Sequence, residues 1–224
     1  MKNILNILTL LLLAAPFQAF SQSEDFQVWG SVSFEKKFTA RWSARAGMRV
    51  KLTENALDVS SARINLGGTY RFNKYFSASA YYNFVERKVR PDYFLPKHQF
   101  RFDAEAKKSL GDFRLSYRCR MEMEYRDVHT SENGLIPSFT ERNRFTLKYK
   151  SGSTLDPFLS YEIYVNLSGP DKYLSNRSRY YAGFSYELNK VNDVSLYFLY
   201  EDNYQINYPL DKYVIGFNFS HTIY

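Results

Sequence analysis

The segment 38–52 alternates strictly between apolar and polar side chains. Its even positions carry Phe38, Ala40, Trp42, Ala44, Ala46, Met48, Val50 and Leu52, and its odd positions carry Thr, Ser, Gly, Arg or Lys. A β-strand points successive side chains to opposite faces, so the segment predicts a strand with one apolar and one basic face. Globular strands usually run about five or six residues, whereas a tilted membrane-spanning strand needs roughly 9–11. The pattern therefore favours a strand that crosses a membrane with its polar face turned inward.

The first residues of the chain have the pattern of a secretion signal. Lys2 supplies a positive charge, residues 4–15 form an apolar stretch, and Ala19 and Ser21 are small residues at the two positions that a signal peptidase reads. The apolar stretch, about a dozen residues, is shorter than the roughly 20 that a transmembrane helix requires. We expect a signal peptide over residues 1–21, cleaved before Gln22, and one β-barrel domain over residues 22–224.

Alternation of the same kind recurs in ten further segments. They lie at 26–34, 61–72, 76–87, 98–107, 113–126, 142–149, 159–166, 177–188, 194–201 and 213–224. The chain also contains 20 tyrosines and 19 phenylalanines, and aromatic residues favour strands and form the girdles of membrane barrels. The sequence therefore predicts an all-β fold, a transmembrane antiparallel up-and-down β-barrel of 10–12 strands.

Short connections alternate with longer ones between these segments, as periplasmic turns alternate with extracellular loops in outer-membrane barrels. The longer connections are expected at 53–58, 88–97, 127–138, 167–176 and 202–210. Eleven segments do not fit the even strand number of bacterial single-chain barrels. We therefore expect either ten strands, with 26–34 outside the regular wall, or twelve, with one strand unidentified.

Composition excludes some classes of partner. The formal net charge of +7 would ordinarily suggest binding to nucleic acid. Here the expected export and the distribution of basic residues by strand face argue against a nucleic-acid partner. The single cysteine, Cys119, has no partner for an internal disulfide and is expected on the apolar face. The three histidines are far apart in the sequence, so we expect neither a metal site nor a cofactor.

The inward face of the expected barrel collects most of the charge. Its residues include Arg41, Arg45, Arg49, Arg63, Arg101, Arg118, Arg120, Glu122, Glu124, Arg142, Arg144, Glu162, Arg177 and Arg179. Unpaired charge in a narrow lumen is costly, so one interpretation is a structural network of arginine–carboxylate pairs that fills the barrel. The other is a basic constriction that attracts anions, since arginine outnumbers acid there and rings of basic residues select anions.

Two further functions are kept as alternatives. A membrane-embedded lipid-modifying enzyme would need a grouping of Ser, His and acid, for which His129 is a candidate because Ser131 and Glu132 lie near it. An exported soluble barrel that binds an apolar ligand would instead turn apolar residues inward and charges outward. We favour a non-enzymatic barrel without catalytic residues, either structural or porin-like with a lumen for small solutes such as anions.

A series of short motifs extends along nearly the whole mature chain. The motifs are Trp29, Arg49, Arg118-Cys119-Arg120-Met121-Glu122, Arg142-Asn143-Arg144, Tyr161-Glu162 and Arg179-Tyr180-Tyr181-Ala182-Gly183. Their order and spacing resemble the outer-membrane β-barrel family catalogued as domain of unknown function 2490. The resemblance implies a barrel in the outer membrane of a Gram-negative-type cell. It supplies no catalytic residues, because the family has no established activity.

The end of the chain partly resembles the signal that the barrel-assembly machinery reads, which typically includes a terminal aromatic residue. Tyr224 is aromatic, but the apolar row before it is one position out of phase. That row is Tyr213, Ile215, Phe217, Phe219 and Ile223. We expect this machinery, outer-membrane lipids and lipopolysaccharide as partners, and a monomeric barrel.

Overall fold

The computed structural model describes residues 23–90, 93–126, 136–169, 172–205 and 209–224. These residues contain β1 (Ser23–Lys37), β2 (Trp42–Thr53), β3 (Asp58–Arg71), β4 (Phe76–Arg90), β5 (Tyr93–Leu110), β6 (Phe113–Arg126), β7 (Ser138–Tyr149), β8 (Leu155–Asn166), β9 (Ser175–Glu187), β10 (Asn192–Asn203) and β11 (Leu210–Ile223). No helix among them is long and apolar enough to cross a membrane. The expected signal peptide and its cleavage site before Gln22 lie outside the described residues.

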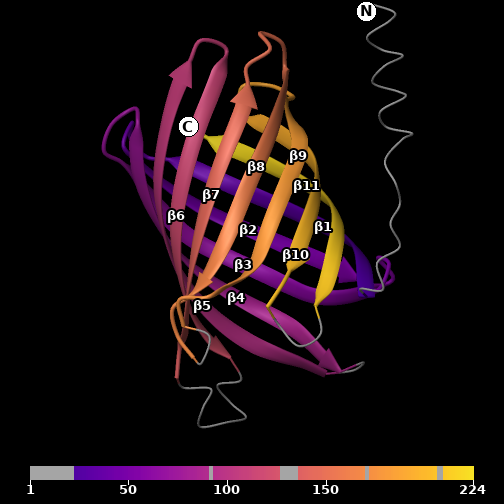
Figure 1. Cartoon of the computed structure of the whole chain (residues 1–224). Helices are drawn as coiled ribbons and strands as arrows, with labels where there is room; N and C mark the ends of the chain where they lie inside the picture. The colour runs from indigo at the N-terminus through magenta and orange to yellow at the C-terminus, as the bar shows by residue number, and fades with distance from the viewer. Residues whose placement is uncertain (1–22, 91–92, 127–135, 170–171, 206–208) are drawn as a thin grey trace, which may run out of the picture.

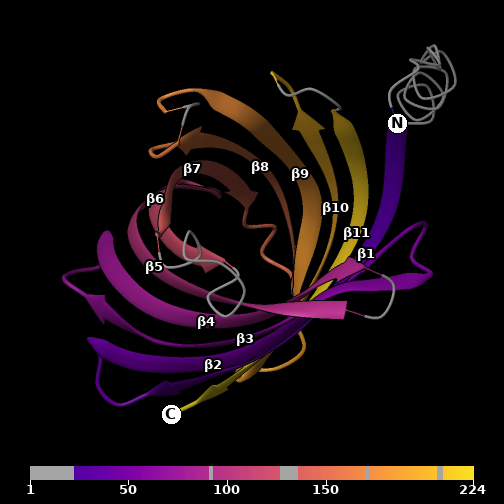
Figure 2. The ribbon, with the colours of Figure 1, turned by 90° about the horizontal axis from the view of Figure 1, so that it is seen from below.

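The strands form a closed barrel. Each strand pairs antiparallel with the next from β1 to β11, and β1 then pairs in parallel with β11. This parallel seam runs from Ser23 opposite Leu210 to Lys36 opposite Ile223. Figure 2 shows the strands following one another round the ring in sequence order, and in Figure 1 β6 to β9 cross β2 and β3 of the far wall at a steep angle. Closure therefore pairs both edges of each of the strands described here.

The observed strand number differs from both numbers expected from the sequence, ten and twelve. The described residues form eleven wall strands, so neither ten nor twelve is right, and the segment at 26–34 belongs to a regular strand. An odd number is accommodated because the seam is parallel. As a consequence, β1 begins at the end of the barrel opposite to the end where β11 finishes.

The two ends of the barrel differ in their connections. We call one the turn end, which carries the connections 38–41, 72–75, 111–112, 150–154 and 188–191 and is uppermost in Figure 1. The other is the loop end, which carries 54–57, 91–92, 127–137, 167–174 and 204–209. The expected alternation of short and long connections therefore holds from β6 onward. It fails at 88–97, because β4 and β5 continue as a paired hairpin to Arg90 opposite Tyr93.

The segment 38–52 is a turn followed by a strand. Strand β2 begins only at Trp42, because the Oγ1 atom of Thr39 accepts hydrogen bonds from the backbone N–H groups of Arg41, at 3.2 Å, and Trp42, at 2.9 Å. Side-chain bonds of this kind favour turns over strands. The alternation in the sequence therefore begins at Phe38, four residues before the strand itself.

The barrel is apolar outside and charged inside. Large side chains such as Met48, Ile64 and Phe102 are exposed on the outer face. The interior buries Glu162 and Glu201, together with a small apolar cluster of Trp29, Tyr181, Tyr197, Leu199 and Val214. This arrangement is the reverse of a soluble globular domain and matches the pattern of barrels that face lipid.

Close packing inside the barrel depends on glycine at a few wall positions. The Cβ of an alanine at Gly67 would lie 2.3 Å from the carbonyl oxygen of Ala80 and 2.2 Å from a ring carbon of Tyr81. Glycine there lets the Tyr81 ring lie flat against the inner wall. The next residue, Gly68, has only the carbonyl oxygen of Ser43 near its Cβ position, at 3.6 Å.

We therefore expect Gly67→Ala to lower the free energy of unfolding by about 1–3 kcal/mol, the usual cost of overpacking a core. Gly68→Ala, one position away in the same strand, is the matched control and should be neutral or slightly stabilising. Urea unfolding of both variants in detergent micelles, followed by circular dichroism, measures the difference. Equal stability of the two variants would contradict the packing described here.

Candidate functional site

The lumen contains a polar cavity of about 540 Å³, and arginine is the commonest residue in its lining. The sheet register places several of these arginines directly opposite one another on neighbouring strands. The opposed pairs are Arg118 with Arg144 and Arg120 with Arg142 between β6 and β7, and Arg49 with Arg63 between β2 and β3. Like charges directly opposite on a ladder are destabilising unless an acid lies between them. The position of the carboxylates therefore decides what each pair can do.

Glu162 on β8 is the counter-charge for the first of these pairs. Its side chain is fully buried, and its carboxylate lies 2.7 Å from Arg118 and 2.9 Å from Arg144. It also accepts hydrogen bonds from Arg142, at 2.9 Å, and from the hydroxyl of Tyr181, at 3.1 Å. Charge-assisted bonds of this kind are stronger than neutral ones. Glu162 thus holds three arginines of β6 and β7 in one cluster.

The second arginine pair has its own acids. Arg142 donates to Glu122 at 2.7 Å, and Arg120 forms a bidentate pair with Asp103 at 2.7 and 2.8 Å. Further round the wall, Glu201 pairs with Arg179 at 2.5 Å and with Lys212 at 2.7 Å. These pairs lie on β5 to β11, so this part of the inner wall is a connected and largely neutralised network.

The Arg49–Arg63 pair has no acid of this kind. Among the described residues, no ion pair involves Arg49 or Arg63, although both line the cavity. Lys51, the next inward residue of β2, is covered by the ring of Trp29, with 3.6 Å between its Nζ and the ring centroid. The wall formed by β2 and β3 therefore presents uncompensated positive charge to the cavity.

Most of the charged residues expected in the lumen from the sequence face the interior, and one does not. Arg41 is exposed in the turn 38–41, because the side-chain bonds of Thr39 end the alternation before β2 begins. Arg45 lies near the turn end and pairs with Glu35 at 2.5 Å. At the loop end, Glu124 pairs with both Lys97 and Arg126.

The remaining two arginines of the expected lumen set lie over aromatic rings. Arg101 lies over the ring of Tyr81, with 4.2 Å between guanidinium carbon and ring centroid, and is 3.7 Å from Asp103. Arg177 lies over Tyr164 at 4.6 Å. A guanidinium over an aromatic face gains a cation–π interaction that is stronger when water is excluded.

Several lumen residues were not identified from the sequence. Lys97 fell in the expected loop 88–97 and Lys212 just before the expected last strand at 213–224, and both prove to be paired strand residues. Leu199 and Val214 are fully buried in the interior, where charged or polar residues were expected. The only signal for these two in the sequence is that they interrupt the polar row of their strands.

The outer face carries a small polar cluster around Asn143. The hydroxyl of Tyr117 donates to Asn143 at 2.6 Å, Asn143 donates to Glu141 at 2.8 Å, and the thiol of Cys119 lies 3.7 Å from the same carboxylate. Cys119 faces outward, as the alternation predicted, but Glu141 and Asn143 interrupt the apolar row. Within the described ranges, this cluster includes no histidine and no second acid, which a metal or catalytic site would need.

The described histidines also lie on the outer face. The Tyr82 hydroxyl and the Nδ1 atom of His98 are hydrogen-bonded at 2.7 Å, and Nδ1 of His221 is the same distance from the side-chain oxygen of Asn192. In the part of the chain that the structure describes, no cluster of His, Cys, Asp or Glu has the form of a metal site. His129, with Ser131 and Glu132, lies outside the described residues.

The solved structures that match this chain include two barrels of low sequence identity. The translocator domain of autotransporter NalP from Neisseria meningitidis matches with a TM-score of 0.43 and 15% identity, over 74% of this chain and 70% of that chain. OccAB1 from Acinetobacter baumannii matches with a TM-score of 0.38 and 11% identity, over 78% of this chain but only 53% of its own. At these scores neither likeness bears on function. A search of curated proteins returned no match.

A family model gives a clear assignment. The model described as "Protein of unknown function (DUF2490)" matches residues 26–210, which is most of the chain. This match confirms the resemblance drawn from the order of motifs in the sequence. The chain therefore belongs to the DUF2490 family.

Proposed function

We propose that the protein is an outer-membrane barrel whose lumen binds small anions and admits them in preference to cations. The Arg49–Arg63 pair carries this proposal. Elsewhere in the barrel each directly opposed arginine pair has a carboxylate of the protein within ion-pair distance. The pair on β2 and β3 has the same geometry in the register and lacks the acid. An oxyanion or halide from solution is the natural counter-charge at that position.

The orientation of the side chains supports placement in a membrane. A soluble barrel for an apolar ligand would need charged residues outside and apolar residues inside. Here the large apolar residues are exposed and most of the arginines and glutamates are internal. A lipid-modifying enzyme lacks support in the described residues, because His98 and His221 bond to a tyrosine and an asparagine and approach no nucleophile.

The paired network supports a narrow lumen. Arg120, Glu122 and Arg179 are each less than a tenth exposed, so side chains fill much of the interior. Interiors of small barrels are usually filled in this way. The two interpretations of the charges drawn from the sequence thus apply to different walls: a structural network on β5 to β11, and free positive charge on β2 and β3.

Membrane placement predicts the effect of a charge on the outer wall. Met48 lies in the middle of β2 and is 52% exposed on the outer face. Met48→Arg should cost about 2–4 kcal/mol of folding free energy in a bilayer, as arginine does near the midplane of a membrane barrel. Leu57→Arg, at the loop end and 89% exposed, is the control and should cost at most about 1 kcal/mol. Reversible folding into lipid vesicles measures both, and similar costs would place Met48 outside the bilayer.

The lumen proposal is tested by ion selectivity. In planar bilayers under a KCl gradient, we expect the wild-type protein to prefer chloride over potassium. The double variant Arg49→Gln/Arg63→Gln should lose most of this preference, because it removes free charge without breaking an ion pair. Arg126→Gln is the control, since its side chain is 60% exposed at the loop end and paired with Glu124. Cation preference in the wild type, or selectivity unchanged in the double variant, would contradict the proposal.

Anion binding has a second readout that needs no open pathway. Sulfate that binds the folded barrel should raise its unfolding temperature, because a ligand of the native state stabilises it by mass action. This rise should be absent in Arg49→Gln/Arg63→Gln and retained in Arg126→Gln. Equal effects of sulfate on all three proteins would indicate a general salt effect.

The network on the opposite wall predicts the effect of removing Glu162. Glu162→Gln should lower the free energy of unfolding by about 3–5 kcal/mol, because it leaves buried arginines without their counter-charge. Sulfate should restore part of this loss by taking the place of the carboxylate. Glu187→Gln is the control, since Glu187 is 59% exposed at the end of β9. Thermal unfolding in micelles measures the change. If Glu162→Gln were as stable as the wild type, Glu162 would not be the residue that holds the three arginines together.

A further inference from the structure

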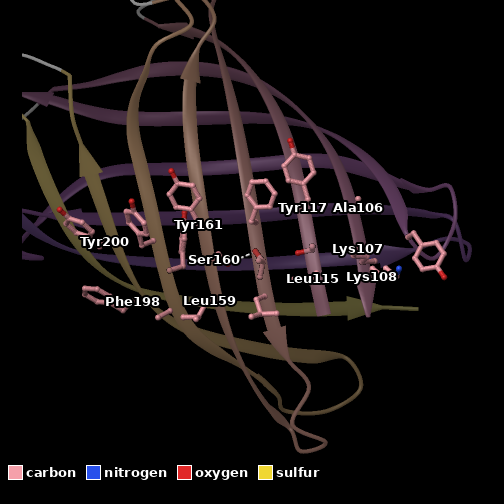
Figure 3. A pocket seen from close by; sticks show the side chains of 18 of the residues that line it. Ala106, Lys107, Lys108, Leu115, Tyr117, Leu159, Ser160, Tyr161, Phe198 and Tyr200 are labelled. Carbon is pink, nitrogen blue, oxygen red and sulfur yellow. Dashed lines mark hydrogen bonds between the residues drawn. The ribbon is translucent and has the colours of Figure 1, made fainter. Parts of the chain in front are cut away.

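The outer wall of β5 to β10 has an apolar hollow of about 1000 Å³ (Figure 3). It begins near the turn end of β5 and β6 and extends obliquely to β10. Figure 3 shows the rings of Tyr117 and Tyr161 along one side and Leu115 and Leu159 along the other. Ala106 and Ala182 line it between these larger residues, so the small side chains leave a recess where a barrel wall would otherwise be convex.

Aromatic rings form a continuous edge of the hollow. Direct cross-strand pairing brings together Tyr117, Phe145, Tyr161, Tyr180 and Tyr200. Ring centroids are 4.8 Å apart between Tyr117 and Phe145 and 5.2 Å apart between Tyr161 and Tyr180. A row of ring faces at this spacing offers a long apolar contact surface, which suits an extended hydrocarbon chain.

Positive charge gathers at the turn-end edge of the hollow. Lys108 lines this edge (Figure 3), and the Nζ of Lys74 lies 5.0 Å from the centroid of Tyr75, which also lines the hollow. Lys107, which pairs with Ser116, belongs to the inward row of β5. The lysines that form ion pairs among the described residues lie elsewhere, and neither Lys108 nor Lys74 is among them. The hollow is therefore apolar along its length and basic at one end.

We infer that the hollow binds an anionic glycerophospholipid, with acyl chains along the aromatic row and the headgroup phosphate at Lys108 and Lys74. Charge complementarity selects this occupant, because basic residues beside an apolar surface at the level of lipid headgroups attract anionic lipids. The volume lies within the range of ligand-sized pockets. The lipid would come from the leaflet at the turn end. This inference rests on the proposed membrane placement but is independent of the lumen.

Native mass spectrometry of the detergent-solubilised protein tests the site by titration with phosphatidylglycerol or phosphatidylcholine. We expect phosphatidylglycerol to bind the wild-type protein more tightly. Lys74→Gln/Lys108→Gln should weaken phosphatidylglycerol binding roughly fivefold for each lysine removed and leave phosphatidylcholine unchanged. Lys190→Gln, at another connection of the turn end, is the matched control and should bind like the wild type. Equal affinity for the two lipids, or equal loss in the control, would overturn the headgroup assignment.

Filling the hollow tests the site of the acyl chains. Ala182→Trp should weaken the binding of both lipids, because the indole ring would occupy the recess. Ala80→Trp places the same ring at an exposed outward position of β4 away from the hollow, and it should have no effect. Lipid binding that Ala182→Trp leaves unchanged, or a dimer of the chain in place of a lipid complex, would overturn the inference. Retained binding in Arg49→Gln/Arg63→Gln would separate this site from the lumen.

Discussion

Backbone pairing at the seam between β1 and β11 is the interaction on which the rest of the structure depends. A strand at an open edge leaves a row of N–H and C=O groups without partners, and no such row can face a hydrocarbon environment. Eleven strands cannot close in a purely antiparallel ring, because the first and last then run in the same direction. The parallel pairing from Ser23 to Lys36 removes the edge, and it also places the start of the first strand at the loop end.

Closure has an electrostatic consequence. An enclosed interior separates its charges from bulk water, so each needs a counter-charge, a hydrogen bond or an aromatic face. On β5 to β11 the protein supplies these itself, with Glu162 and Glu201 fully buried among arginines and a lysine. On β2 and β3 it supplies no acid for Arg49 and Arg63. The wall of β5 to β11 is therefore a structural network, and the wall of β2 and β3 is the candidate anion site.

The sequence predicts the facing of side chains far better than the pairing of strands. Alternation in segments such as 113–126 has a physical cause in the pleat of the strand, so the inward positions of Arg118 and Arg142 follow from it. Strand number does not follow, because β1 has the same alternation whether its partner is parallel or antiparallel. Arg41 was misplaced because the alternation continues through a turn that the side chain of Thr39 forms.

The opposition of Arg49 and Arg63 depends on a local irregularity that no residue pattern indicates. Next to the connection 54–57, Leu52 pairs with Val59. An unbroken register from that point would set Arg49 opposite Ala62 and turn Arg63 to the outer face. Instead Ser60 remains unpaired in a bulge, its hydroxyl donates to the carbonyl oxygen of Lys51 at 3.2 Å, and pairing resumes with Lys51 opposite Ser61.

This bulge restores agreement between the pairing and the apolar outer face of β3, and the same step brings two arginines together inside. Bulges are frequent next to functional sites because they redirect side chains in this way. Between β6 and β7, Arg118 and Arg144 share the carboxylate of Glu162. Arg49 and Arg63 are opposed in the same manner but share no carboxylate. The bulge therefore places two positive charges side by side, and an anion from outside the chain can neutralise them.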